Sequence, residues 1–215
     1  MKFSILPKKK VETTPTPTPT VELGPQSSLA DIIAPTAIET DFSYIRIGET
    51  YYRTFFVTSY PRYVSANWLQ PLIDFENELN LSFFIYPEQA SEVISSLQRK
   101  IAEMEATIAS DTERGQVINP SVSAALEDAL SLQDSLAKGI ERFFQFGLYI
   151  TISANSIKEL QDETKKLTTT LASMLLAPKA ATLQMEESFK TTLPMGSDRL
   201  YLTRNMDTTS LASTF

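Results

Sequence analysis

The amino-acid sequence is most regular over residues 91–143, which read SEVISSLQRKIAEMEATIASDTERGQVINPSVSAALEDALSLQDSLAKGIERF. Apolar side chains recur there at alternating intervals of three and four, the spacing that keeps one apolar seam on a single helix face. Gly115 and the pair Asn119 and Pro120 interrupt the pattern and predict a turn. We therefore predict an antiparallel helical hairpin over 91–143, with arms about 30 Å long at about 1.5 Å per residue.

The predicted seam has one break, at Gln133, and leaves two interpretations of the hairpin open. The two helices can pack on each other and complete the core, or they can form an arm that docks a partner. Small outer residues such as Ala102, Ala106 and Ala109 allow another helix to approach closely. The seam residues are Ile94, Leu97, Ile101, Met104 and Ile108 in the first helix and Val122, Leu126, Ala129, Leu136, Ile140 and Phe143 in the second.

Strand patterns flank the hairpin on both sides. Residues 44–47 and 51–58 are rich in β-branched and aromatic side chains, and Gly48 with Glu49 suits a two-residue type II′ turn between them. Residues 79–86 form a third candidate strand, with Leu81, Phe83 and Ile85 on one face. After the hairpin, apolar residues alternate with others over 144–153, which predicts a strand with one buried face. Ala181, Leu183 and Met185 suggest a final strand.

Two further helices are predicted between these strands. Ser65 is a plausible N-cap of a short helix that includes Trp68 and Leu72, with Pro71 in its first turn or at a kink. Ser156 and Glu159 match a capping box at the start of a longer helix, which runs up to Pro178.

These elements predict an α+β fold. The order strand, helix, strand, hairpin, strand, helix, strand is that of a ferredoxin-like split βαβ sandwich, with a long antiparallel helical-hairpin insertion between strands two and three. The Thr-Pro alternation at 13–20 favours extended conformations, so residues 1–40 are expected to be a disordered Thr/Pro-rich tether. Residues 41–190 are then the folded domain, and 191–215 are expected to be a linker because they lack a clear period.

Composition excludes several kinds of chemistry. The chain has 215 residues, a formal charge of −7, and neither cysteine nor histidine. Zinc sites built from thiolate or imidazole, cysteine nucleophiles and histidine-based triads are therefore impossible within it. Its six glycines are isolated and form no phosphate-binding loop. No apolar run approaches the roughly 20 residues that span a bilayer, and we expect a cytoplasmic location.

The remaining candidates for chemistry favour structural interpretations. Adjacent carboxylates on a helix do not face each other, so the pairs Glu76 with Glu78, Asp162 with Glu163, and Glu186 with Glu187 are interpreted as solvated faces. We predict no catalytic, cofactor-binding or metal-ligating residue, and no enzymatic activity for the chain as given. The strand aromatics are interpreted as core rather than as a surface for ligands; they are Tyr51, Tyr52, Phe55, Phe56 and Trp68.

Several runs of sequence resemble the N-terminal region of VirB4-like (also TraC-like or TraE-like) conjugation ATPases, the motors of type IV secretion systems. The runs are structural in character and contain no catalytic group. They are 51–57 (YYRTFFV), 60–64 (YPRYV), 68–69 (WL), 148–152 (LYITI) and 207–215 (DTTSLASTF).

The resemblance covers residues 38–215 and implies a division of labour. In that family a C-terminal RecA-like domain carries the Walker residues and would use ATP and Mg²⁺, whereas the N-terminal region attaches the motor to the secretion channel. The resemblance implies that this chain is a non-catalytic assembly domain with no cofactor of its own, and that 191–215 lead toward a motor domain not present in this chain. Inner-membrane channel proteins and further copies of the chain are the implied partners. The resemblance also implies that DNA is contacted only indirectly, that there is no small-molecule substrate, and that the chain is cytoplasmic and peripheral at the inner face of the cell membrane.

Two other possibilities remain open from the sequence. The chain can be a fragment that ends where a motor would begin or a standalone docking module. A standalone ferredoxin-like module that binds single-stranded nucleic acid is the alternative from another class, because exposed strand aromatics of such folds stack on bases. The acidic composition and the absence of a basic-Gly-aromatic signature at 143–150 speak against it.

Overall fold

The computed structural model describes residue 34 and residues 37–61, 63–117 and 119–214. The chain divides into two units at residue 35, and the second, Thr36–Phe215, is compact. The Thr-Pro tract of the predicted tether lies outside the described residues. All the helices and strands described below belong to the second unit.

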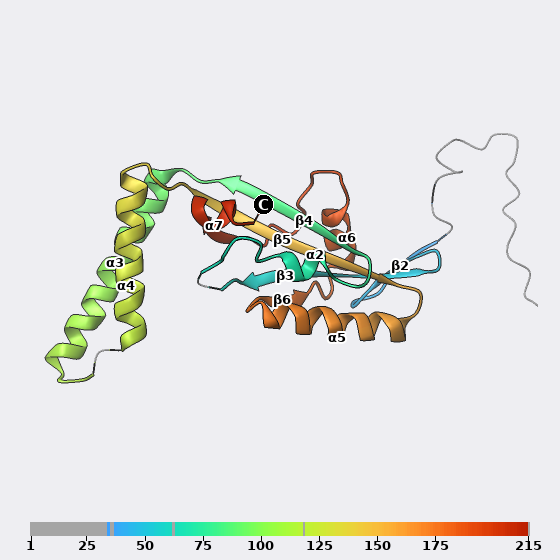
Figure 1. Ribbon diagram of the computed structural model, residues 1–215, viewed down its shortest axis with the longest axis horizontal. Helices are drawn as coiled ribbons and strands as arrows, with labels where there is room; N and C mark the ends of the chain where they lie inside the picture. The colour runs from blue at the N-terminus through green and yellow to red at the C-terminus, as the bar shows by residue number, and fades with distance from the viewer. Residues whose placement is uncertain (1–33, 35–36, 62, 118, 215) are drawn as a thin grey trace, which may run out of the picture. The chain divides into compact units, whose positions relative to one another are not determined.

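The second unit is built on a seven-stranded antiparallel sheet (Figure 1). The main path has the order β1-β2-β3-β5-β4, while β6 pairs with β3 and β7 pairs with β5. The long central strands β3 and β5 thus connect all the others. The strands are β1 (Ile38–Thr40), β2 (Ile45–Ile47), β3 (Thr50–Ser59), β4 (Leu79–Pro87), β5 (Phe143–Ala154), β6 (Ala177–Ala180) and β7 (Arg204–Asp207).

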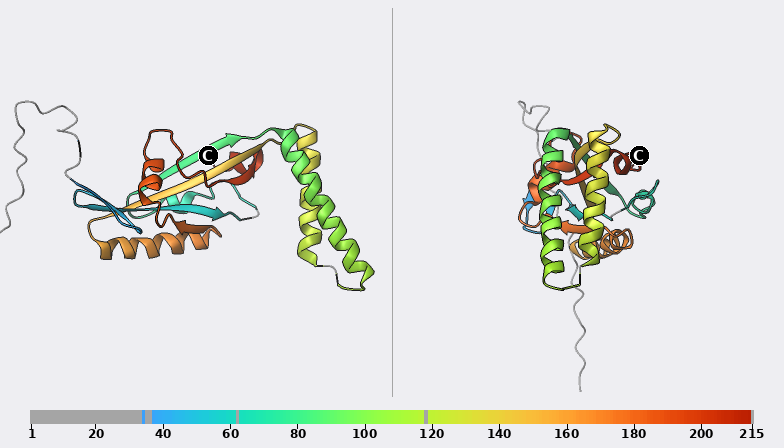
Figure 2. Two further views of the ribbon diagram at one scale, coloured as in Figure 1. Left: turned by 180° about the vertical axis from the view of Figure 1, so that it is seen from behind. Right: turned by 90° about the vertical axis from the view of Figure 1, so that its left-hand side faces the viewer.

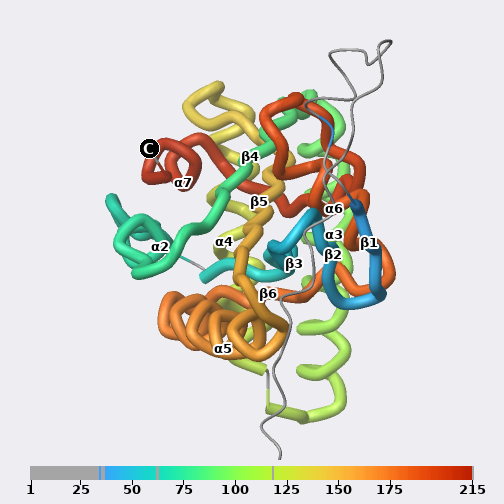
Figure 3. Tube along the Cα trace, turned by 90° about the vertical axis from the view of Figure 1, so that its right-hand side faces the viewer, coloured from blue at the N-terminus to red at the C-terminus, as the bar shows by residue number. Residues whose placement is uncertain are grey.

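Six helices accompany this sheet in the described part of the chain, and the unit is therefore a mixed α/β structure. Helices α2 and α5 lie on one face of the sheet and α6 lies on the other (Figures 1 and 3). The predicted α+β class is confirmed at this level. The helices are α2 (Gln70–Ile73), α3 (Ala90–Glu113), α4 (Pro120–Ala137), α5 (Ile157–Ser173), α6 (Met185–Thr192) and α7 (Thr208–Ala212).

Helix α5 forms where its start signals predict it. The Ser156 side chain accepts a hydrogen bond from the Glu159 amide at 3.2 Å, and Glu159 Oε2 accepts one from the Asn155 amide at 2.9 Å. These bonds satisfy backbone donors that the first turn of a helix leaves unpaired. The inner side of α5 is fully buried in the main core, where Leu160, Leu167 and Leu171 pack with Phe55, Val57, Leu148, Ile150 and Ile152.

Strand β5 is buried on both faces, whereas its alternation predicts one buried face. Tyr149 and Thr151, on the face away from α5, are as inaccessible as Ile150. Helix α6 and the residues after it cover this second face. The Thr151 and Thr192 hydroxyls lie 2.9 Å apart, and the Tyr149 hydroxyl accepts a hydrogen bond from the Leu202 amide at 3.0 Å. Polar partners from elsewhere in the chain therefore allow these side chains to be buried.

The predicted strand through Ala181, Leu183 and Met185 is wrong. The last strand of that region is β6, which ends at Ala180, and Met185 is the first residue of α6. Leu183 lies between them with a φ of +68° and is 81% exposed. A left-handed residue cannot continue a strand, so the alternation at these positions is a coincidence of a turn followed by a helix.

Other boundaries also differ from the predictions. Ser65 is not the N-cap of the first helix, since α2 begins at Gln70 with Leu69 as its N-cap. Strand β1 lies within the predicted tether of residues 1–40. Residues 191–215, predicted to be a linker, contribute β7 and α7, and the described part of this segment packs on the sheet with Met206 buried.

Candidate functional site

Helices α3 and α4 extend away from the sheet at one end of the unit (Figures 1 and 2). Helix α3 ends, and helix α4 begins, at the residues that predict a turn in the sequence. Gly115 has a φ of +67° immediately after the C-cap of α3. Asn119 is the N-cap of α4, its side chain accepts a hydrogen bond from the Ser121 amide at 3.0 Å, and Pro120 occupies the first helical position. The two helices lie side by side (Figure 2), and α3 ends at Glu113 seven residues before α4 begins at Pro120.

The seam between α3 and α4 is only partly buried. In α3 the buried residues are Val93 and Ile101, and in α4 the buried residue is Leu136. Each of two packed helices buries only the part of its apolar seam that faces the other helix. The rest of the seam surface remains accessible and can contact a further helix. The half-buried seam residues are Ile94, Leu97, Met104, Ile108, Val122, Leu126, Ala129 and Leu132.

The base of the pair is fixed to the sheet by a small apolar cluster. Val93, Leu136 and Phe143 form its buried part, and Ile94, Leu97 and Leu132 pack against them. Phe143 is also the first residue of β5, and its carbonyl accepts a hydrogen bond from the Glu88 amide at 3.0 Å. Both helices are thus attached where β4 ends and β5 begins.

The C-terminal segment reinforces the same base. The Arg142 amide donates to Thr208 Oγ1 at 2.8 Å, and the Thr208 amide donates to the Arg142 carbonyl at 3.1 Å. The Thr209 amide donates to the Glu141 carboxylate at 3.2 Å. Backbone bonds of this kind restrict how the chain can turn between α4 and β5.

The apolar seam predicted for the second helix of the hairpin extends beyond the end of α4. Helix α4 ends at Ala137, and Ile140, which was assigned to the seam, is 70% exposed beyond it. Gly139 has a φ of +71°, which suits a chain reversal after a helix. Phe143, also assigned to the seam, is instead a strand residue that packs against the base of the helices.

The carboxylate pairs are solvated as predicted, with one exception. Glu76 and Glu78 are exposed, and Glu186 is paired with Lys190, which holds the pKa of that carboxyl below its usual range. Glu163 differs, because it faces inward from α5 and is only 6% exposed. Its Oε1 accepts a hydrogen bond from Lys166 at 2.9 Å, and this bond raises the pKa of the lysine.

The strand aromatics belong to the core and its margins. Phe55 is buried, and Tyr51 and Trp68 pack against the same core cluster. The Tyr52 ring lies 5.0 Å from that of Phe189 on α6. On the central strand Tyr149 is inaccessible, so it cannot stack on a base in the way the nucleic-acid alternative requires.

A cleft of about 520 Å³ separates α2 from α5. Asp74 and Glu76 line it together with Lys165 and Lys166, and Phe75 provides an apolar wall. The opposite charges offset each other, so the cleft has no marked preference for a charged ligand.

Neither a metal-binding group of side chains nor a membrane-spanning helix is found among the described residues. Across 34, 37–61, 63–117 and 119–214, no group of three or more acidic side chains is arranged to hold a metal ion. No helix in that part of the chain combines the length and the apolar character that crossing a membrane requires. No protein-family model matches the chain, and no curated protein matches it.

Two side chains of interest escaped sequence reasoning. Asp198, in a segment without periodicity, is buried under the hydroxyl groups of Tyr86 and Tyr149. Nothing local in the sequence marks it. Glu163 could have been found, because it lies three residues after Leu160 and four before Leu167, on the inner side of α5.

Proposed function

We propose that this chain is a non-catalytic assembly module whose α3–α4 pair docks partner proteins. The observation that carries the proposal is the seam of that pair, which is anchored at one end by Val93, Leu136 and Phe143 and, apart from the buried Ile101, is half accessible along the rest of its length. Helices that serve only to complete a core bury their apolar stripe against the sheet. A further helix laid along the accessible side would bury the remaining apolar surface.

The finer fold assignment is part of the same proposal. The strands β3, β4, β5 and β6 follow the connections β3-α2-β4 and β5-α5-β6, and they lie side by side in the order β6-β3-β5-β4. This arrangement supports a ferredoxin-like split βαβ core in which α3 and α4 are an insertion between the second and third core strands. Strands β1, β2 and β7 are then additions to its edges.

The resemblance to VirB4-like proteins gives the proposed setting. The module would attach a conjugation or type IV secretion ATPase to inner-membrane channel proteins and to neighbouring copies of itself, at the cytoplasmic face of the cell membrane. Support comes from the runs 51–57 and 148–152, which contribute to the paired central strands β3 and β5. Reading the coding sequence beyond Phe215 tests this setting. A G-x-x-x-x-G-K-[ST] motif there would support it, and a stop codon would leave only a standalone docking module.

Sedimentation velocity of the purified chain tests the docking surface through its self-association. The double substitution Ala102→Glu and Ala109→Glu places two charges on exposed positions of α3 that each follow a seam residue directly and so flank the accessible side of the seam. We expect it to reduce the association constant at least about tenfold, because charges within an apolar helix contact lose solvation. The melting temperature should not change, since both alanines are exposed.

Ala172→Glu is the matched control, because Ala172 is an exposed alanine on α5. This variant should associate like the wild type. Replacement of residues 91–139 by a short Gly/Ser bridge should give a folded monomer. Association that survives this deletion would contradict the proposal, as would loss of the cooperative unfolding transition, because α3 and α4 would then be core elements.

A further inference from the structure

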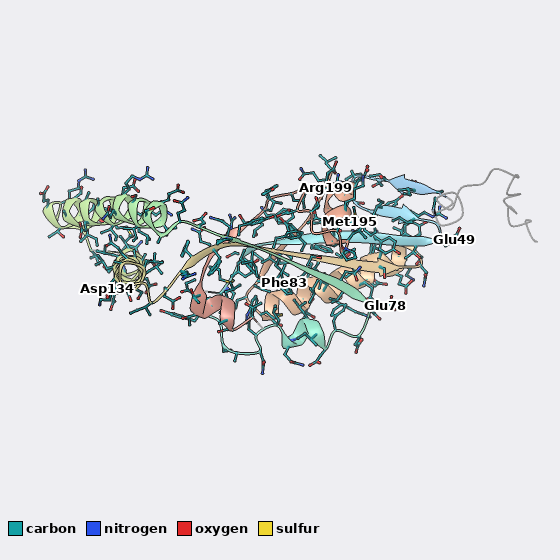
Figure 4. The ribbon with its side chains drawn as sticks, turned by 90° about the horizontal axis from the view of Figure 1, so that it is seen from above. Glu49, Glu78, Phe83, Asp134, Met195 and Arg199 are labelled. Atoms are coloured by element: carbon teal, nitrogen blue, oxygen red, sulfur yellow. The ribbon has the colours of Figure 1, made fainter. Side chains whose placement is uncertain are left out.

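A polar pocket of about 300 Å³ lies at the end of the sheet where β5 ends and β4 begins. Figure 4 shows Glu78 at this end of the unit, with Glu49 nearby and Asp134 of α4 at the opposite end. The pocket is therefore separate from the proposed docking helices. The residues that give it its character are Asn77, Glu78, Asn155, Glu159 and Glu163.

The pocket is acidic. Glu78, Glu159 and Glu163 contribute three carboxylates, and none of its described lining residues is a lysine or arginine. The hydrogen bond from the Asn155 amide to Glu159 Oε2 fixes one of these carboxylates in the first turn of α5. Three carboxylates around one hollow, of which only Glu163 is paired with a lysine (Lys166), leave a net negative charge that favours the binding of a cation.

Glu163 provides the second and independent observation. The residue is more than nine-tenths buried, and Lys166 pairs with its Oε1. Its Oε2 is also buried, but it has no hydrogen-bond partner among the described residues. A buried carboxylate oxygen without a donor is unfavourable, and such an atom in a native structure points to a missing partner.

We propose that this pocket binds a guanidinium group, presented by an arginine side chain of a docked protein partner. A guanidinium carries five N–H donors in a plane, so it can donate to Glu163 Oε2 and to the neighbouring carboxylate and amide oxygens together. It is also less strongly hydrated than an ammonium group, which makes transfer next to a buried carboxylate less costly. A calcium ion would require six to eight oxygen ligands, whereas Lys166 already occupies one oxygen of Glu163.

The identity of the partner as a protein rests on the proposed assembly function, but guanidinium binding itself does not. Deletion of residues 91–139 removes the docking helices and leaves the pocket residues in place. The two proposals can therefore fail separately.

Titration of the full chain with Nα-acetyl-arginine amide, followed by amide chemical shifts in NMR spectra, tests the pocket. We expect saturable shifts centred on residues 153–159 and a Kd on the order of 1 mM, as suits one small side chain. Nα-acetyl-lysine amide should bind at least about threefold more weakly. Magnesium and calcium chloride should cause no saturable shifts there.

The substitution Glu163→Gln keeps the shape of the side chain and removes its charge, and we expect it to weaken arginine-amide binding about tenfold. Asp162→Asn is the matched control, because it removes the same charge from the adjacent, exposed position, and it should retain wild-type affinity. Glu78→Gln, at an exposed lining residue, should weaken binding without changing the melting temperature and covers the case in which Glu163→Gln does not fold.

Several outcomes would overturn the proposal. They are shifts that stay linear with concentration, equal affinity of the arginine and lysine probes, equal effects of Glu163→Gln and Asp162→Asn, and tighter binding of a divalent metal ion than of the arginine probe.

Discussion

Asp198 shows how a single side chain attaches the C-terminal segment to the sheet. Its carboxylate accepts hydrogen bonds from the Tyr149 hydroxyl at 3.0 Å and the Tyr86 hydroxyl at 3.2 Å. The amides of Leu200 and Tyr201 donate to the same carboxylate at 3.0 and 2.9 Å. A buried carboxylate with four donors is well compensated, so it can hold the segment in one position.

The substitution Tyr149→Phe tests this network. It leaves the Leu202 amide without a partner and removes one of the four donors to Asp198, and we expect a loss of about 1–3 kcal/mol in the free energy of unfolding. Urea denaturation at neutral pH measures the loss. Tyr201→Phe is the control, since the Tyr201 ring is exposed and stacks on Tyr86, and its effect should be small.

The same variant should change the response to alkaline pH. Burial, followed by the charge of Asp198, raises the pKa of Tyr149 above the ordinary tyrosine value of 10, and burial likewise raises the pKa of Tyr86 to about 12. A raised pKa means that folding favours the neutral phenol, so its contribution is complete below about pH 10 and is lost as the pH rises further. The stability of the wild type should therefore fall above about pH 10, and that of Tyr149→Phe should fall less. Parallel curves would contradict this assignment.

At the scale of elements, the sequence predicts best the segments that are long and strictly periodic. Strand β5 and helices α3, α4 and α5 all form in the segments where they are predicted, although α4 and α5 end before their predicted limits at 143 and 178. Their local patterns are sufficient because each element buries a continuous stripe or face. The short elements α2, β6 and β7 depend on tertiary contacts instead: β6 and β7 each pair with only part of a longer strand. No local period records such a contact, which explains why residues 177–180 and 204–207 were missed.

The candidate sites likewise can be predicted from the sequence only where they arise from a periodic pattern. The seam of α3 and α4 can be recognised in the sequence because its apolar residues recur at regular intervals. Its residues are half exposed because a pair of helices buries only the surface between them. The acidic pocket joins residues 77–78 to residues 153–163, which periodicity cannot bring together. Glu163 was misassigned because its neighbour Asp162 is solvated and the two were treated as a pair.

The base of the α3–α4 pair can be tested by the substitution Leu136→Ala. Leu136 is buried against Val93 and Phe143, so its truncation should cost about 2–4 kcal/mol locally. We expect hydrogen exchange to accelerate throughout α3 and α4, while β3 and β5 keep their protection.

Leu130→Ala is the control on the same helix. Leu130 is 44% exposed, and its truncation should change exchange by less than the equivalent of about 1 kcal/mol. Equal effects of the two variants would show that the small cluster does not anchor the pair.

For the whole molecule, β5 is the strand on which both layers of the unit depend. It pairs with β3, β4 and β7, and its two faces contact α5 and α6. The substitution Ile150→Asp would place an unpaired charge in the main core, and we expect it to abolish the cooperative melting transition. Circular dichroism measures the result. Ile38→Asp, on the exposed strand β1, should melt within a few degrees of the wild type.

The attachment of α3 and α4 to adjacent strands has a kinetic consequence. Pro87 and Phe144 are opposite each other in the sheet, although residues 88–143 separate them along the chain. The entropic cost of closing a loop grows with the number of freely moving residues within it. Antiparallel association of α3 with α4 folds most of those residues locally, in the microsecond range typical of helical structure, and brings the two strand ends together. We therefore expect β4 and β5, the longest strand pair of the sheet, to associate as fast as two strands joined by a short loop.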